Sequence, residues 1–376
     1  MISVEDFQRA AAEWLAANAA HAPRDYGAIC PPDLVEAGRD WQRRLTDAGW
    51  AGIHWPVEHG GRGLSPEHNG VWLLECAKAG VPAVFNMVGF VLAGGAVMRY
   101  GTPQQQAAHL RPTLATEHVW CQLFSEPGAG SDLGSLATRA ELDGDRYVID
   151  GQKVWCSGGR YSNWGILMAR TRAVDPESGH GKHDGISFFL CPMDLPGIEV
   201  RPLRQMTGGS EFDEVFFTDV SLPADHLLGP EHGGWGVGMA VLTSERGHIG
   251  TSVIGLERRL DQMARLADGR ALDPTGRESL AALMSRGMAL TAMAQRQGSI
   301  ASTAASLTKL GITEMMFDVA MLRGDVAGAD AMLDGADAAG MLAAPGGRIA
   351  GGTSQVQRNI IGERLLGLPR EPKPAP

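Results

Sequence analysis

Hydrophobic residues recur at helical spacing over the first part of the chain, up to about residue 117. The apolar positions of the first such stretch share one helix face and are Phe7, Ala11, Trp14 and Leu15. A second stretch with this period covers residues 71–78. Between the two, residues 54–66 are rich in proline and glycine, which interrupt a helix. The pattern predicts an N-terminal domain, residues 1–117, of helices joined by loops.

The pattern changes between residues 118 and 232, where short apolar runs alternate with turn residues. Asp150 and Gly151 lie between two alternating segments, and this dipeptide is typical of a two-residue β-hairpin turn. Further apolar runs of strand length lie at residues 185–193, 197–203 and 214–223. The pattern predicts a middle domain of antiparallel β structure, folded as a barrel or a sandwich.

From residue 233 the helical period returns and continues to the end, with breaks at residues 269–274 and 344–352. A helical bundle is the natural packing for such a segment. We therefore expect an α+β multidomain fold: the N-terminal helical domain, the middle β domain over residues 118–232, and a C-terminal helical bundle over residues 233–376.

The net charge of the chain and its lack of long apolar runs restrict the classes of molecule that it is expected to bind. A net charge of -10 and an isoelectric point near 5.6 argue against a nucleic-acid-binding protein, because such proteins carry a dominant basic patch. No apolar run reaches the ~20 residues that cross a bilayer, and the N-terminus lacks the pattern of a cleavable signal. We expect a cytoplasmic protein without nucleic-acid or membrane partners.

Cysteine and histidine spacing predicts no metal site. The five cysteines are widely separated single residues, which indicates reduced thiols packed in the core. The eleven histidines fall mostly in expected loops and are predicted to lie on the solvated surface.

Three segments carry candidate chemistry, and the first is residues 121–159. Its residues 126–131, Glu-Pro-Gly-Ala-Gly-Ser, form a loop of small residues that a ligand could approach closely. The hydroxyl groups of Ser125 and Ser131 flank this loop, which suits a planar polar ligand or a phosphate. An ordinary turn has the same composition, so this loop alone decides nothing.

The second segment, residues 233–260, has the apolar stripe of one helix. The members of this stripe are Trp235, Met239, Leu242, Ile249, Val253, Leu256 and Leu260. Glu245 and Arg246 interrupt the stripe on the side expected to be buried. A charge there is costly unless it is paired or functional, so the two residues form either a buried ion pair or a catalytic site. Desolvation would raise the pKa of such a carboxyl group toward the pH at which a general base works.

The third segment is residues 348–372. Gly351 and Gly352 permit close approach of the main chain, and Thr353 or Ser354 can cap the helix that follows. The buried side of that helix is expected to consist of Val356, Ile360, Ile361 and Leu365. A helix N-terminus favours phosphate groups, although an ordinary capped helix shows the same pattern.

Taken together, these three segments resemble the signatures of the acyl-CoA dehydrogenase family, and the resemblance covers nearly the whole chain. It implies FAD as the cofactor and the α,β-dehydrogenation of an acyl-CoA thioester to the 2-enoyl-CoA, with a hydride passed to flavin N5. It also implies a homo-oligomer, a dimer or tetramer, that is reoxidised by an electron-transfer flavoprotein or an equivalent acceptor.

The resemblance also implies roles for individual residues. In a subgroup of the family the general base is the Glu immediately before a CoA-contacting Arg, an arrangement that Glu245 and Arg246 match. Substrate contacts are implied at Ser131, Thr243 and Arg246. Cofactor contacts are implied at Gln122, Leu123, Phe124, Ser125, Ser131, Trp155, Cys156, Ser157, Thr353 and Gln355.

Some features depart from the family pattern. Most members place the catalytic Glu two residues before the Thr that Thr353 matches, where this chain has Gly351. The family's RxxFG element is not recognisable after residue 260, and the glycine-rich segment at residues 327–347 is degraded. A catalytically silent subunit of a mixed tetramer, a flavin oxidase acting on a nitroalkane-type substrate and a flavin-free scaffold therefore remain alternatives. The acyl group stays open between fatty, branched and steroid-derived thioesters.

Overall fold

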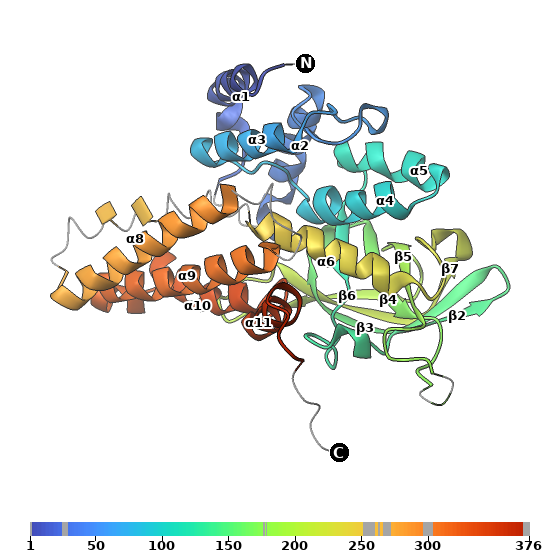
Figure 1. The fold of residues 1–376 in the computed structure, drawn as a ribbon. Coiled ribbons are helices and arrows are strands. Elements are labelled where there is room, and N and C mark those ends of the chain that lie inside the picture. The colour runs from blue at the N-terminus through green and yellow to red at the C-terminus, as the bar shows by residue number, and fades with distance from the viewer. Residues whose placement is uncertain are drawn as a thin grey trace. The chain divides into compact units, whose positions relative to one another are not determined.

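The chain forms two compact units, Met1–Ser244 and Glu245–Pro376, here called unit 1 and unit 2 (Figure 1). The computed structural model describes residues 2–24, 29–175, 177, 179–250, 260–261, 264–265, 272–295 and 304–370. Within these residues, no helix has both the length and the apolar character needed to span a membrane. Each unit is described separately below.

Unit 1 begins with helices, as predicted. They are α1 (Val4–Asn18), α2 (Val35–Asp47), α3 (Pro66–Ala79), α4 (Gly94–Tyr100) and α5 (Pro103–Leu114). Capping side chains explain where several of them start: the hydroxyl groups of Ser3, Ser65 and Thr102 accept main-chain N–H groups of the first turns of α1, α3 and α5. Phe7 and Leu15 are buried on α1, which confirms the predicted face.

A seven-stranded sheet follows the helices. Its strands are β1 (Trp120–Leu123), β2 (Arg139–Asp143), β3 (Arg146–Ser157), β4 (Trp164–Arg170), β5 (Ile186–Pro192), β6 (Ile198–Leu203) and β7 (Phe212–Pro223). Their order is β1-β4-β2-β3-β7-β6, and β5 pairs with β4. The pairs β2–β3, β3–β7, β4–β5 and β6–β7 are antiparallel, as predicted, whereas β4 runs parallel to both β1 and β2, so the sheet is mixed.

The hairpin turn lies six residues before the predicted one. Asp143 pairs with Arg146, so Gly144 and Asp145 form the two-residue turn between β2 and β3. Gly151 instead lies inside β3, where the pairing with β7 shifts register. A Cβ atom at Gly151 would lie 2.5 Å from Thr138 Oγ1, so glycine is needed there for close packing.

Strands β4 and β5 are buried on both faces, which explains their unbroken apolar sequences. On one face, Ile166, Phe188 and their neighbours join the core of the N-terminal helices. On the other face, Leu167 and Phe189 join a second core, formed with β2, β3 and β7. Both cores draw on the same two strands, so the helices and the sheet of unit 1 form one packed body.

Helix α6 (Gly234–Gly250) carries the chain from unit 1 into unit 2. The remaining helices of unit 2 are α8 (Pro274–Gln295), α9 (Ala304–Ala327), α10 (Ala336–Ile349) and α11 (Ser354–Ile360), and a π-helical turn at Ile361–Leu365 follows. The buried core residues are Leu260, Leu283, Leu290, Ile312, Met315, Val319 and Leu322. Helix α10 continues through Pro345, so the predicted break at residue 344 starts too early. Residues 269–271 and the side chains of Ile249, Val253 and Leu256 lie outside the described residues.

Several histidines are not on the solvated surface as predicted. His68 and His109 are buried, and the rings of His109, His118 and His226 surround Trp164. His109 Nδ1 lies 3.3 Å from His118 Nδ1. Burial, together with the smaller effect of the neighbouring imidazoles of His118 and His226, lowers the pKa of His109 to about 4. The ring of His109 therefore packs as a neutral aromatic group.

Candidate active site

In unit 1, the first predicted cofactor segment follows strand β1. The side chains of Leu123 and Phe124 are buried in the two cores, so these residues can offer a ligand only their main-chain groups. Gln122 and Ser125 are half-buried and keep polar side chains available. The Ser125 carbonyl accepts the N–H of Val154 at 2.9 Å, which ties this segment to the second one on β3.

A buried ion pair fixes the small-residue loop at residues 126–131. Glu126 and Ala129 exchange two main-chain hydrogen bonds of 3.0 Å, which close the turn and leave Ser131 exposed. The Glu126 carboxylate accepts the N–H groups of Ala137 and Thr138 at 2.6 and 2.9 Å. Lys153 on β3 donates to that carboxylate at 2.8 Å and to the carbonyl of Phe124 at 3.0 Å.

The charges of this pair compensate each other. The Lys153 side chain is 0% exposed and that of Glu126 is 8% exposed. Burial lowers the pKa of Lys153, and Glu126 partly offsets this effect. Burial would raise the pKa of Glu126, but Lys153 and the hydrogen bonds from Thr138 and Ala137 hold it below its ordinary value. Sequence reasoning missed Lys153, although a lysine within an expected strand was a usable signal.

Trp155 is the most unusual residue of the second segment. Its φ is 61°, in the left-handed region that non-glycine residues avoid, and it lies where the pairing of β3 with β7 is irregular. The indole is 54% exposed. Backbone strain beside an exposed aromatic ring is typical of a ligand site.

The two residues after Trp155 differ from each other. Cys156 is fully buried, so its thiol is out of reach of a ligand and only its main chain remains available. Ser157 is half-buried and lines a small cavity together with Asn86, Met87 and Tyr161. The hydroxyl of Ser157 is therefore accessible from the interior of unit 1.

The buried face of helix α6 differs from the predicted stripe. Trp235, Met239 and Leu242 are only half-buried. The fully buried positions are Gly234, Val237, Gly238 and Val241. Glu245 comes four residues after Val241 and continues this buried face, whereas Arg246 falls on the neighbouring stripe.

Three residues of α6 are candidates for a chemical role: Thr243, Glu245 and Arg246. Glu245 is half-buried. Thr243 donates its hydroxyl to the Met239 carbonyl at 2.8 Å. The side chain of Arg246 lies outside the described residues.

In unit 2, two glycines in the left-handed region precede helix α11. Gly351 and Gly352 have φ of 64° and 93°, and a Cβ atom at Gly352 would lie 2.6 Å from Gln357 Nε2. The Gln357 amide donates to the Gly351 carbonyl at 3.0 Å. The Thr353 hydroxyl caps α11 by accepting the N–H of Val356 at 3.2 Å, as the sequence predicted.

The buried side of α11 differs from the predicted one. Gln355 is exposed and Thr353 half-buried, so both predicted cofactor contacts can reach a ligand. The predicted apolar side is only half-buried, and the buried positions are the polar residues Ser354 and Gln357. Hydrogen bonds account for this inversion: the Ser354 hydroxyl donates to Glu314 of α9, and the Gln357 amide donates to the Gly351 carbonyl.

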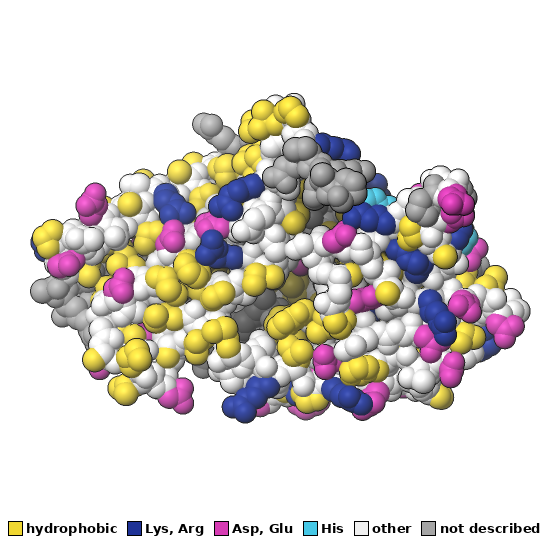
Figure 2. Space-filling view, turned by 90° about the horizontal axis from the view of Figure 1, so that it is seen from below, with side chains coloured by type: hydrophobic (Ala, Val, Ile, Leu, Met, Phe, Trp, Pro, Cys, Tyr) yellow, Lys and Arg dark blue, Asp and Glu magenta, His cyan; other side chains and the backbone are white. Residues whose placement is uncertain are grey.

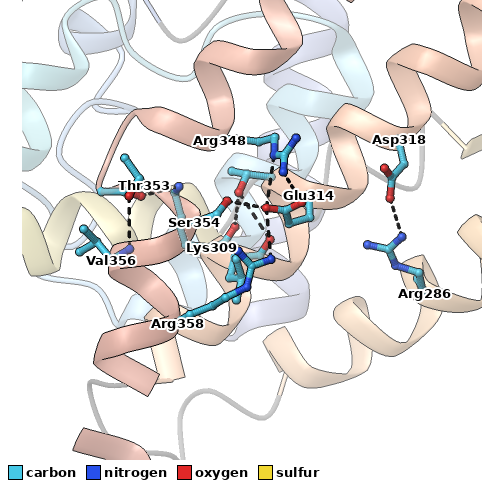
Figure 3. A network of polar contacts seen from close by, with 12 residues as sticks. Arg286, Lys309, Glu314, Asp318, Arg348, Thr353, Ser354, Val356 and Arg358 are labelled. Atoms are coloured by element: carbon cyan, nitrogen blue, oxygen red, sulfur yellow. Dashed lines mark hydrogen bonds and ion pairs between the residues drawn. The ribbon is translucent and has the colours of Figure 1, made fainter. Parts of the chain in front are cut away.

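Helix α9 holds the Gly351–Thr353 segment through two charged side chains (Figure 3). Lys309 donates to the Gly352 carbonyl at 2.7 Å. Glu314, one turn further along α9, accepts the hydroxyl of Ser354 and pairs with Arg348 at 3.1 Å and with Arg358 at 3.7 Å. Sequence reasoning missed both residues.

Lys309 and Glu314 lie in different environments, and the pKa of each is lowered for a different reason. Lys309 is fully buried, and burial lowers its pKa to about 8, while the negative charges of Glu245 and Glu314 oppose that shift. The hydroxyl of Ser354, together with Arg348 and Arg358, holds the pKa of Glu314 below its ordinary value against the effect of burial. Lys309 is therefore a buried cation within electrostatic reach of Glu245.

The predicted site residues thus form two groups. Gln122, Ser125, Ser131, Trp155 and Ser157 belong to unit 1, where the buried pair of Glu126 and Lys153 links their segments. Glu245, Thr353 and Gln355 belong to unit 2. There, Lys309 donates a hydrogen bond to the Gly352 carbonyl and lies within electrostatic reach of Glu245 on α6.

Each of the two groups, taken by itself, offers groups that suit part of a flavin dinucleotide. The exposed indole of Trp155 offers a flat apolar surface to a ring system, and the hydroxyl groups of Ser125, Ser131 and Ser157 offer hydrogen bonds. In unit 2, the exposed amide of Gln355 and the hydroxyl of Thr353, which can still donate a hydrogen bond while it caps α11, offer further polar groups.

Comparison with known proteins agrees with this reading. Family models match the chain in three consecutive parts: acyl-CoA dehydrogenase N-terminal domain over residues 4–117, middle domain over 121–220 and C-terminal domain over 232–366. Acyl-CoA dehydrogenase IpdE1 of Mycobacterium tuberculosis is 40% identical over 390 residues, covering 99% of this chain and 100% of that protein. IpdE1 of Mycolicibacterium smegmatis is 37% identical, with 99% of this chain and 100% of that protein covered.

Solved structures show the same fold. The structure described as the Tcur3481-Tcur3483 steroid ACAD has a TM-score of 0.83 at 26% identity and covers 98% of both chains. The ChsE4-ChsE5 complex from Mycobacterium tuberculosis has a TM-score of 0.79 at 27% identity, with 98% of this chain and 100% of that chain covered. The chain therefore belongs to the acyl-CoA dehydrogenase family, FAD-dependent oxidoreductases that act on CH–CH bonds.

Proposed function

We propose that Glu245 is the general base of this acyl-CoA dehydrogenase and takes the α-proton of the thioester. The observation that carries the proposal is its position: Glu245 continues the buried face of α6 and lies within electrostatic reach of the buried cation Lys309. The position where most family members carry a catalytic Glu is Gly351, which has no side chain to act as a base. A relocated base on α6 accounts for both observations.

The remaining predicted residues bind and orient. FAD, when bound, supplies the acceptor at flavin N5 for the hydride that leaves the β-carbon. We propose that Gln122, Ser125, Trp155 and Ser157 in unit 1, together with Thr353 and Gln355 in unit 2, hold this cofactor. Ser131, Thr243 and Arg246 are the proposed substrate contacts.

Replacement of Glu245 by Gln tests the assignment. The variant keeps the size and hydrogen-bonding capacity of the side chain but removes its basicity, so we expect it to bind FAD normally and to lose at least about 100-fold in the rate of flavin reduction by acyl-CoA. Glu278→Gln, at an exposed position on α8, is the control and should behave like the wild type. Near-native flavin reduction in Glu245→Gln would show that another group is the base.

For the substrate, we propose a steroid-derived acyl-CoA thioester. The proposal is supported by the solved relative described as a steroid ACAD, which matches 98% of this chain. Steady-state assays with an artificial electron acceptor should give a higher kcat/KM for steroid-derived thioesters than for straight-chain fatty acyl-CoA. A preference for straight chains of any length would contradict this choice.

A second candidate is that the chain works as one subunit of a mixed assembly. Both solved relatives described above carry the names of two proteins in their descriptions. Unit 2 also exposes many large hydrophobic side chains. They are Met284, Met288, Met332, Leu333, Leu342, Ile349, Leu366 and Leu368. Hydrophobic side chains are spread over the face of the molecule that Figure 2 shows.

Two measurements separate the homo-oligomer from the mixed assembly. A self-sufficient enzyme gives one FAD per chain and a dimer or tetramer by light scattering when it is purified alone. A mixed assembly gives substoichiometric FAD, or aggregation, until a second dehydrogenase chain is co-expressed.

We further propose that an electron-transfer flavoprotein reoxidises the enzyme, as its membership of the family suggests. Anaerobically reduced protein should then transfer electrons to such an acceptor much faster than to dissolved oxygen. Rapid oxygen consumption without an acceptor protein would instead identify an oxidase of the same fold.

A further inference from the structure

The buried ion pair of Glu126 and Lys153 joins the two proposed cofactor segments of unit 1. The Lys153 ammonium donates to the Glu126 carboxylate at 2.8 Å and to the Phe124 carbonyl at 3.0 Å. The carboxylate also accepts the N–H groups of Ala137 and Thr138. A buried ion pair is often no more stabilising than apolar side chains of similar volume, so stability alone does not account for this arrangement.

The pair makes a connection that the pairing of strands does not make. Strand β1 leads into the loop, but it is not a neighbour of β3 among the described strands, because β4 and β2 come between them in the sheet order. Three contacts connect the loop to β3 instead: Lys153 with the Phe124 carbonyl, the Val154 N–H with the Ser125 carbonyl at 2.9 Å, and Lys153 with Glu126. Three consecutive residues of the loop are thus attached to two consecutive residues of β3.

On β3, this attachment comes directly before the irregular position that carries Trp155. The pairing of β3 with β7 shifts register between Lys153 and Cys156. Lys153 and Val154 are both buried, so the alternation of buried and exposed side chains reverses at this point and Trp155 is exposed. The pair therefore fixes the strand immediately before the residue whose φ is 61°.

We propose that the ion pair of Glu126 and Lys153 is a positioning device for the flavin: it holds the loop with Ser125 and Ser131 in a fixed place relative to the Trp155 indole, so that loop and indole contact one bound cofactor. The Lys153 side chain is enclosed by protein, so it acts through the groups that it holds. This inference rests on the proposed cofactor contacts of the two segments.

Two variants separate positioning from stability. Lys153→Met leaves the Glu126 carboxylate buried without its cation, so it loses both the contacts and stability. The double variant Glu126→Gln/Lys153→Met has no charge in this pair and should recover part of the stability, but it lacks the ammonium that binds the Phe124 carbonyl. Leu283→Ala is the control, because it opens a cavity in the core of unit 2 and lowers stability without a change in either segment.

The first measurement is FAD binding to the apoprotein, followed by flavin fluorescence at a temperature at which every variant is folded. Lys153→Met and the double variant should both bind FAD at least about tenfold more weakly than the wild type, because a displaced loop no longer presents its hydroxyl groups beside the indole. Leu283→Ala should keep the wild-type affinity although it is less stable. If the double variant recovers FAD affinity together with stability, the positioning role is overturned.

The second measurement uses the variants at saturating FAD. The visible circular dichroism of the bound flavin should change in both Lys153 variants, and the single-turnover rate of flavin reduction at saturating acyl-CoA should fall about tenfold, because the ring is displaced. A wild-type spectrum and rate in both variants would overturn the proposal. If neither folds, Glu126→Gln takes their place, since it keeps the size of the side chain and one acceptor oxygen. The same changes are then expected, and wild-type behaviour has the same consequence.

The outcome for Trp155→Gly distinguishes this inference from the proposed cofactor site. Weaker FAD binding in Trp155→Gly with wild-type binding in the double variant refutes only the role of the ion pair. Wild-type FAD binding in Trp155→Gly refutes the proposed contact of the indole itself, whatever the variants of the pair show.

Discussion

Two buried lysines illustrate how single residues organise the proposed site. Lys153 is paired directly with Glu126 at 2.8 Å, so most of its compensation comes from one carboxylate. Lys309 relies on a main-chain carbonyl at 2.7 Å and on two carboxylates that act at longer range. The first arrangement serves rigidity, because both partners are fully engaged.

The Lys153 pair gives a prediction on stability. Lys153→Met should lower the free energy of unfolding by about 3–5 kcal/mol, because Glu126 is then buried without its cation. Chemical denaturation would measure the loss, and the double variant with Glu126→Gln should recover part of it. Lys182→Met breaks the exposed pair with Asp132 and should cost less than about 1 kcal/mol. Equal losses for the two lysine variants would contradict the role of burial.

Trp155 gives a prediction of opposite sign. Trp155→Gly should raise the free energy of unfolding of the FAD-free protein by about 1 kcal/mol, because glycine adopts a φ of 61° without strain. The same variant should bind FAD more weakly, since the exposed indole is lost. Thermal unfolding of the apoprotein and a fluorescence titration measure the two effects. A destabilised apoprotein would show that the indole packs more than it strains.

At the scale of elements, Gly352 lies just before Thr353, the residue that caps α11. Gly352→Ala should destabilise the protein by about 1–3 kcal/mol, because alanine disfavours a φ of 93° and its Cβ would meet Gln357. Gly347→Ala, inside α10 with open space around it, should instead be neutral or stabilising. Thermal unfolding of both variants checks this contrast, and a similar response of the two would contradict it.

The sequence and the structure diverge at this scale for one recurring reason. Periodicity located most helices and strands, because it reflects which positions can be buried. It placed the hairpin turn at Asp150-Gly151 and not at Gly144-Asp145, because both dipeptides suit a turn and only the pairing of β2 with β3 decides between them. It also misplaced the buried face of α6. Gly234 and Gly238 have no side chains, so Ser187 and Met168 of the sheet can lie close to this helix.

At the scale of the whole molecule, the histidine cluster predicts how stability depends on pH. His109 has a folded pKa of about 4, below its ordinary value near 6.5, so the unfolded chain binds the proton more tightly. The contribution of this group is fully present above about pH 6.5 and is lost as the pH falls toward 4.

Thermal unfolding between pH 8 and pH 5 measures this dependence. The midpoint temperature should fall with pH in the wild type and fall less in His109→Gln, which cannot take up the proton. His54→Gln, at an exposed position, should keep the wild-type dependence. An identical dependence in all three proteins would exclude His109 as the source.

The sequence alone determined the fold class and the family, because the order of helical and alternating patterns and three local motifs are properties of short segments. It also located the segments of the proposed site and the capping role of Thr353, which depend on neighbours along the chain. Only the tertiary structure showed the mixed sheet, the buried faces of α6 and α11, and the burial of Lys153 and Lys309. These features depend on residues far apart in the sequence, such as Lys153 with Glu126 and Lys309 with Gly352, whose contacts exist only after packing has enclosed them.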